Sequence, residues 1–209
     1  MTITGEFETH LTIASSETVG VEPLRMLAAD NEMKVTHILL SRGEAPSQLM
    51  LTRHNVGTLD ETLAAAHAFT AQLATRGLKV CRTKIEVDAT NPAAPADAPA
   101  AKANSADWYF EYHVKVLLPS PADVDHLGEV GRRHAAQLSR NAFLMRLDGR
   151  EERFLTQRFY STGRDQASPA LDALTADLQQ NGFTILDCEA EYVVFDSNVA
   201  MDAGWLDAT

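Results

Sequence analysis

The stretch Phe7-Glu-Thr-His-Leu-Thr-Ile13 recurs 103 residues later as Phe110-Glu-Tyr-His-Val-Lys-Val116. In both copies apolar residues alternate with polar ones, which is the pattern of a strand with one buried face. Helical, hairpin and strand patterns follow each copy in the same order. Gly77 and Gly182, which end the second helical pattern of each half, lie 105 residues apart. This nearly constant offset predicts an internal duplication.

Each half is predicted to form strand, helix, strand, strand, helix and strand. The local signals include a capping box from Thr58 to Glu61, Asp148-Gly149 as a hairpin turn, and Ser168-Pro169 as a helix start. The predicted strands span 7–13, 34–40, 47–54 and 78–88 in the first half, and 110–116, 142–147, 153–160 and 183–195 in the second. This order is the split βαβ motif, in which both helices cover one face of the sheet.

The predicted fold class is therefore α+β, with two ferredoxin-like βαββαβ modules. The first module spans residues 1–88 and the second spans 108–209 together with a C-terminal tail. Between them, residues 89–107 are rich in alanine and proline and contain no large apolar side chain. Such a composition favours a mobile linker.

Charged residues gather on the sheet faces that the helices leave open. Strand alternation assigns two groups to these faces: Glu8, His10, Arg82, Lys84 and Glu86 in the first module, and Glu111, His113, Lys115, Asp187, Glu189 and Glu191 in the second. Charges on central strands are costly unless they are paired or bind something. We therefore expect the open faces to meet around a polar cleft or tunnel. The alternatives are faces exposed to water, or faces that only form salt bridges with each other.

The composition excludes some classes of partner. The net charge is −11, with no run of lysine or arginine, so a nucleic-acid partner is not expected. No apolar run approaches the roughly 20 residues of a membrane span. The first residues also lack the pattern of a signal peptide, and a cytoplasmic location is expected. The sequence leaves the oligomeric state open.

His10 and His113 are the two histidines that the repeat relates, and each lies two residues after a glutamate. If they share a cleft, they are candidates for a catalytic acid and base on one ligand. The alternative is that each pair of glutamate and histidine only stabilises its own module.

The other charged residues suggest the ligand. Arg82, Lys84 and Lys115, with Arg53 and Arg158 beside them, are candidates to bind a small anionic molecule, most simply a phosphorylated one. Glu86, Glu189 and Glu191 are candidates for a divalent metal ion such as Mg²⁺, and histidine with glutamate would suit Zn²⁺. The predicted function is binding or hydrolysis of such an anion. Whether the protein is an enzyme stays open, as does a purely structural use of the charged faces.

Two short stretches resemble motifs of phosphate enzymes. His10-Leu-Thr-Ile13 resembles the His-x-Thr motif of the two-histidine phosphoesterases, which implies an acid and a base acting on a phosphodiester. In the second half, Lys115 stands where that motif has Thr or Ser. Glu6-Phe-Glu-Thr-His10 resembles the Glu-x-Glu-x-Lys opening of the triphosphate-tunnel enzymes, which implies a charged tunnel, with His10 in place of the lysine.

A third likeness concerns order along the chain. The succession His10, Glu86, His113 and Glu191 is similar to the paired-module metalloenzymes of the glyoxalase type, which take a histidine from an early strand and a glutamate from a late one. This resemblance implies a His/Glu metal-dependent enzyme. The helix before each last strand departs from that family's module. Each of the three resemblances covers a few residues, and none assigns a family.

Overall fold

The computed structural model describes residues 2–14 and 21–206. The first half contains β1 (Thr4–Ile13), α1 (Val21–Ala29), β2 (Lys34–Leu40), β3 (Ser47–Thr58), α2 (Leu59–Ala74) and β4 (Val80–Asp88). After α3 (Ala98–Ala103), the second half contains β5 (Tyr109–Leu118), η1 (Pro121–Asp123), α4 (Val124–Arg133), β6 (Gln137–Asn141), β7 (Glu151–Tyr160), α5 (Arg164–Gln180), β8 (Thr184–Asp196) and η2 (Val199–Asp202). The predicted mixture of helices and strands is confirmed.

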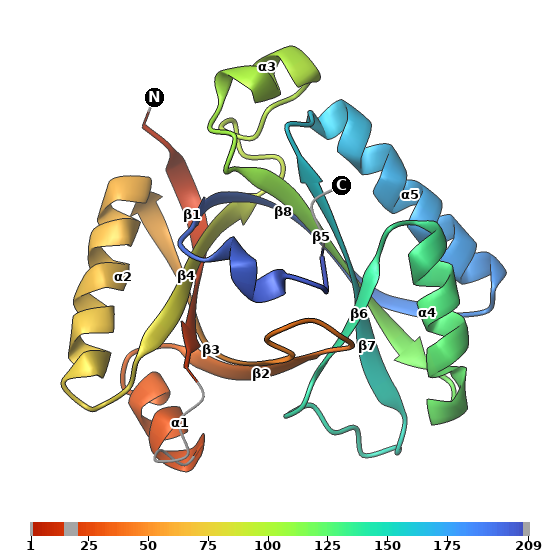
Figure 1. Cartoon of the computed structure of the whole chain (residues 1–209), viewed down its shortest axis with the longest axis horizontal. Coiled ribbons are helices and arrows are strands. Elements are labelled where there is room, and N and C mark those ends of the chain that lie inside the picture. The colour runs from red at the N-terminus through yellow and green to blue at the C-terminus, as the bar shows by residue number, and fades with distance from the viewer. Residues whose placement is uncertain (1, 15–20, 207–209) are drawn as a thin grey trace.

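The strands of the described residues form one closed antiparallel barrel in the order β1-β3-β2-β6-β7-β5-β8-β4 (Figure 1). Within each half the first and last strands are neighbours, as in a ferredoxin-like module. The halves join edge to edge, through β2 with β6 and through β4 with β8. We expected two separate sheets facing each other. Pairing the edges instead satisfies their backbone groups and still brings the open faces together inside one barrel.

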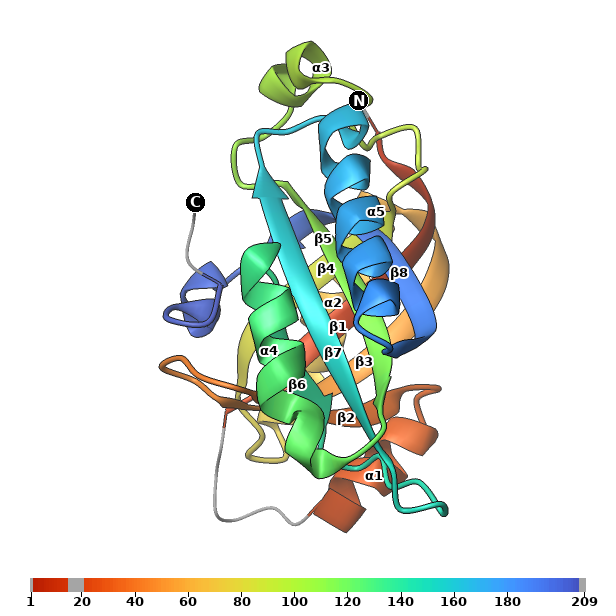
Figure 2. The ribbon, with the colours of Figure 1, turned by 90° about the vertical axis from the view of Figure 1, so that its right-hand side faces the viewer.

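The helices cover the outside of the barrel, with α1 and α2 over the first half and α4 and α5 over the second (Figures 1 and 2). Each half has an apolar core between its helices and its strands. In the first half this core includes Leu11, Leu24, Leu51 and Leu73, and in the second it includes Val114, Leu127, Leu155 and Leu174. The alternate residues of the same strands point inward, so the barrel has an apolar outer layer and a polar interior. Among the described residues, no helix is long and apolar enough to cross a membrane.

Local signals in the sequence explain the ends of several helices. Thr58 and Glu61 form the predicted capping box at the start of α2. Gly77 and Gly182 adopt positive φ angles of 74° and 79°, directly after the turns that end α2 and α5. Glycine tolerates this left-handed conformation, so the chain can turn from helix to strand at both places.

Residues 89–107 pack against the barrel, although a mobile linker was expected. Ala94 and Ala101 are buried, and α3 forms within the segment. The backbone N–H of Arg164 donates to the carbonyl of Pro95 at the start of α5. The carbonyls of Pro95 and Ala96 accept from the first N–H groups of α5, which have no partner within the helix itself.

Two predicted boundaries in the second half are wrong. The strand expected at 142–147 is β6, which ends at Asn141, and the residues after it form a loop. In that loop Asp148 accepts hydrogen bonds from Arg146 and Arg150, so Asp148-Gly149 belongs to a longer charged loop. The helix expected at Ser168-Pro169 begins earlier, and the proline lies inside α5. The carbonyls of the 89–107 segment allow this earlier start.

Candidate functional site

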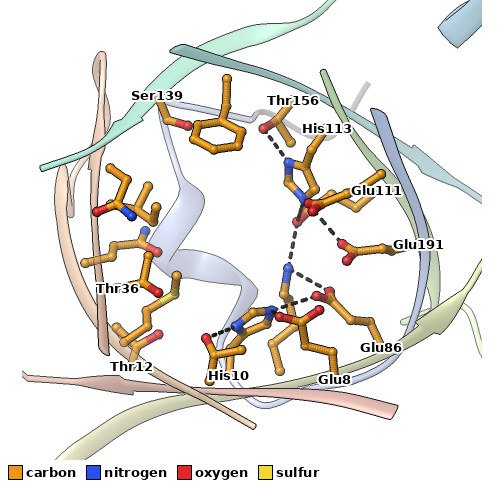
Figure 3. A pocket seen from close by; sticks show the side chains of 18 of the residues that line it. Glu8, His10, Thr12, Thr36, Glu86, Glu111, His113, Ser139, Thr156 and Glu191 are labelled. Atoms are coloured by element: carbon orange, nitrogen blue, oxygen red, sulfur yellow. Dashed lines mark hydrogen bonds and ion pairs between the residues drawn. The ribbon is translucent and has the colours of Figure 1, made fainter. Parts of the chain in front are cut away.

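The barrel encloses a cavity of about 390 Å³. One wall, from β1, β4, β5 and β8, is densely charged, and the opposite wall is mainly apolar or hydroxylated (Figure 3). The charged wall contains Glu8, His10, Arg82, Lys84, Glu86, Glu111, His113, Lys115, Asp187, Glu189 and Glu191. The opposite wall, from β2, β3, β6 and β7, contains Lys34, Thr36, Ile38, Leu40, Gln48, Met50, Thr52, His54, Ser139, Asn141, Phe154 and Thr156. Strand alternation therefore predicted the inward-facing charges correctly.

His10 lies between a threonine and two glutamates. Its Nδ1 is 2.9 Å from Thr52 Oγ1, and its Nε2 is 2.7 Å from Glu86 Oε1 and 3.6 Å from Glu8 Oε1. Ligand atoms of Glu8, His10 and Glu86 all lie within 4.8 Å of one another, a spacing that suits one metal ion. Burial disfavours the imidazolium of His10, but the charge of Glu86 and the hydrogen bond to it outweigh burial and raise the pKa of His10.

His113 has matching partners in the second half. Its Nδ1 is 2.9 Å from Thr156 Oγ1, and its Nε2 is 3.4 Å from both Glu111 Oε1 and Glu191 Oε2. Burial alone would lower the pKa of His113, but the contacts with Glu111 and Glu191 raise it to about 10. Burial, followed by the nearby charge of Glu86, raises the pKa of Glu191 to about 7.

Lys84 connects the two histidine sets. Its Nζ lies 2.8 Å from Glu86 Oε2 and 2.8 Å from Glu111 Oε1. His10 and His113 are therefore joined through one lysine and two carboxylates on the same wall (Figure 3). Burial would raise the pKa of Glu86, but Lys84 and then His10 hold it below its usual range.

The C-terminal segment closes one mouth of the barrel, where η2 lies across the opening (Figures 1 and 2). Asp202 is buried there, 2.9 Å from an Arg82 nitrogen and 2.6 Å from an Arg158 nitrogen. The indole N–H of Trp205 donates to the carbonyl of Leu138. The C-terminal tail thus supplies a counter-charge for two buried arginines.

The candidate anion-binding residues already have carboxylate partners. Arg82 pairs with Asp196 and Asp202, Lys84 with Glu86 and Glu111, Lys115 with Glu152, and Arg158 with Glu111 and Asp202. The positively charged groups that a phosphate would need are therefore already bound to carboxylates. The geometry therefore does not support the expected phosphorylated ligand, and the predicted salt bridges between the two charged faces are present in its place.

Arg53 was a candidate ligand residue, but the structure places it outside the cavity. It is exposed, while its neighbours Thr52 and His54 face inward. The residue equivalent to Arg158 is His54 rather than Arg53, because the registers pair Glu8 with His54 and Glu111 with Arg158. A one-residue error in matching strands moves a side chain to the opposite face.

The candidate metal ligands separate into two groups. Glu86 belongs to the Glu8–His10–Glu86 set, whereas Glu191 contacts His113 and Glu189 pairs with His113 in the strand register. Sequence reasoning placed Glu8 on the right face but did not select it as a ligand. It also missed Thr52 and Thr156, although their offset of 104 residues matches the repeat.

Comparisons with known proteins find likeness in structure only. No family model matches the chain, and no curated protein matches it. Chlorite dismutase from Candidatus Nitrospira defluvii, in complex with imidazole, aligns over 91% of this chain and 91% of that chain, at 15% identity and a TM-score of 0.31. A mutant of the same chlorite dismutase aligns over 91% and 92%, at 15% identity and a TM-score of 0.30. At these values the likeness carries no inference about function or cofactor.

Proposed function

We propose that the barrel binds a divalent metal ion through Glu8, His10 and Glu86, and that the metal acts on a small polar molecule in the cavity. The observation that carries this proposal is the close grouping of two carboxylates and one imidazole, within 4.8 Å, on the neighbouring strands β1 and β4. These groups are the usual ligands of catalytic metal ions.

The surroundings support a site with open coordination positions. The three side chains come from one wall, and the cavity lies in front of them. Three protein ligands with free positions are typical of catalytic rather than structural metal sites. In such a position a bound metal ion polarises a substrate oxygen or lowers the pKa of a bound water. An acidic surplus among the described lining residues also favours a cation over an anion.

Thr52 supports the role of His10 as a ligand. When the neutral imidazole donates its Nδ1 proton to Thr52 Oγ1, 2.9 Å away, the Nε2 lone pair faces Glu8 and Glu86. A partner on the distal nitrogen is the usual way in which proteins fix the tautomer and the orientation of a metal-binding histidine.

Glu191 is the better candidate for moving a proton in the cavity. His113 was expected to act as an acid or base near neutral pH, but its pKa of about 10 keeps it charged there. Glu191, with a pKa of about 7, changes charge near neutral pH and lies on the cavity wall. A group whose pKa is close to the working pH is the most effective acid–base catalyst.

We also infer that the two halves arose by duplication and then diverged. The same strand order, helix order and His–Thr contacts in both halves support this origin. The two halves differ in the charge of equivalent residues. Lys84 on β4 corresponds to Glu189 on β8, so a positive side chain in one half stands where the other has a negative one. In this proposal the residues around His10 bind a metal ion, whereas those around His113 form a network of salt bridges.

Calorimetric titration of chelator-treated protein with Zn²⁺, Mn²⁺, Mg²⁺ and Ca²⁺ tests the metal proposal. We expect the wild type to bind at least one of these ions, and His10→Ala and Glu86→Gln to lose that binding. His113→Ala is the matched control, because it removes the equivalent imidazole of the other half. Absence of binding to the wild type, or an equal loss in His113→Ala, would show that the metal is not held by this set.

A further inference from the structure

His54 is a third imidazole beside the proposed metal set. It lies on β3 directly opposite Glu8, and its side chain lines the cavity. Its Nε2 is 3.6 Å from Glu8 Oε1, on which His10 Nε2 also converges at 3.6 Å. With 49% of its side chain exposed, His54 is not held by tight packing and has room to adjust.

In the second half of the barrel, an arginine occupies the position equivalent to His54. Arg158 stands opposite Glu111 just as His54 stands opposite Glu8. The guanidinium of Arg158 donates to Glu111 Oε2 at 2.5 and 2.8 Å, so a cation of the protein itself fills that space. In the first half the shorter imidazole leaves the equivalent space beside the glutamate to a cation from outside.

The distances from Glu8 to the two imidazoles are close to those around one metal ion. Two ligand atoms that are each about 2.1 Å from one ion lie about 3.0 to 3.4 Å apart at octahedral or tetrahedral angles. The separations of 3.6 Å between Glu8 and each imidazole are close to this range. The 2.7 Å contact between His10 and Glu86 is a hydrogen bond, which would open slightly when a metal replaces the shared proton. His54 lies outside the group of ligand atoms that are all within 4.8 Å of one another, so its half-exposed ring would turn toward His10 and Glu86 when a metal binds.

We propose that His54 is a fourth ligand, so that Glu8, His10, His54 and Glu86 form a site for a transition metal ion. This inference rests on the proposed function. Two imidazoles with two carboxylates favour Zn²⁺, Fe²⁺ or Co²⁺, whereas Mg²⁺ and Ca²⁺ prefer oxygen ligands alone. The sequence did not point to His54, because its counterpart in the repeat is an arginine.

The test compares wild type, His54→Ala and His54→Arg in competition titrations of Zn²⁺ and Co²⁺ against a chelator. We expect His54→Ala to weaken both by more than the roughly 10- to 100-fold that loss of a supporting partner costs. His54→Arg, which copies the second half, should abolish binding, because its guanidinium would fill the site. His126→Ala, at a histidine paired with Asn181 outside the cavity, is the control.

X-ray absorption of the Zn²⁺-loaded proteins gives a readout that does not depend on affinity. We expect scattering from two imidazoles in the wild type and from one in His54→Ala. Wild-type affinity in His54→Ala, or one imidazole in the wild type, would overturn the role of His54 and leave the three-residue site standing. Absence of any binding to the wild type would overturn both proposals.

Discussion

The buried carboxylate of Glu111 contacts Lys84, Arg158 and His113. The carboxylate lies 2.8 Å from Lys84 Nζ and 2.8 Å from Arg158 Nε, and Glu111 is 3% exposed. Glu111→Gln would leave two buried cations short of negative charge. We expect it to lower the free energy of unfolding by about 3 kcal/mol, since breaking a buried ion pair from one side is strongly destabilising.

Glu8→Gln is the matched control for this change, because Glu8 occupies the same position in the first half. Its side chain is 26% exposed, and its contacts are with histidines. In chelator-containing buffer we expect a loss below about 1 kcal/mol, as for a solvent-accessible pair. Equal losses in urea unfolding of the two variants would contradict the unequal use of the two glutamates.

The charge of His113 should make stability depend on pH. Its pKa is raised from about 6.5 in the unfolded chain to about 10 in the folded one. The imidazolium therefore contributes stability that is complete below about pH 6.5 and is lost as the pH rises to about 10. We expect the difference in unfolding free energy between wild type and His113→Gln to shrink over this interval. A difference that stays constant from pH 6 to pH 10 would show that His113 is not held charged.

At the residue scale, alternation along the strands was enough to place Glu8, His10, Glu111 and His113 in the interior, because a strand has a fixed period of two. It was not enough to show which charges are already neutralised. Asp202 comes from a tail segment whose position depends on the closed barrel, and no local pattern in the sequence indicates it. The expected anion site failed because its cations are already paired with carboxylates, and Asp202 is one of these.

At the scale of elements, α4 packs closely on β7 at a glycine. A Cβ added to Gly131 would lie 2.5 Å from Leu155 Cδ2, well inside van der Waals contact. We expect Gly131→Ala to destabilise the protein by about 1–3 kcal/mol through overpacking. Gly128→Ala in the same helix, where the nearest atom is 3.2 Å away at the flexible end of Leu138, should be close to neutral.

Thermal unfolding of the double variant Gly131→Ala, Leu155→Val distinguishes packing from other effects. Leu155→Val shortens the side chain by one methylene and withdraws the Cδ2 atom from Gly131, so it should recover part of the stability that Gly131→Ala loses. Simple addition of the two single losses would mean that the helix does not approach β7 as closely as described.

The elements themselves were largely predictable where local signals were strong. Thr58 with Glu61 and the glycines after α2 and α5 mark helix ends through contacts within a few residues. The start of α5 was misplaced because its first N–H groups bond to carbonyls of the distant 89–107 segment. The closure of the barrel was not predicted either, since edge pairing between β2 and β6 depends on chain segments 100 residues apart.

At the scale of the whole molecule, the C-terminal segment completes the barrel by covering one mouth. Trp205 is 5% exposed and donates to Leu138 across that opening. We expect Trp205→Ala to lower the free energy of unfolding by about 3–5 kcal/mol, as for a large buried aromatic side chain. A loss below about 0.5 kcal/mol in urea unfolding would show that the segment does not dock on the barrel in solution.

In the proposed function, one half of the barrel holds a metal ion and the other half does not. Crystals grown with Mn²⁺ or Zn²⁺ test it most directly, through an anomalous difference map collected at the absorption edge of the metal. We expect a peak between Glu8, His10 and Glu86, beside His54, and none between Glu111, His113 and Glu191. A peak at the second set, or no interior peak at metal concentrations that saturate binding in solution, would contradict it.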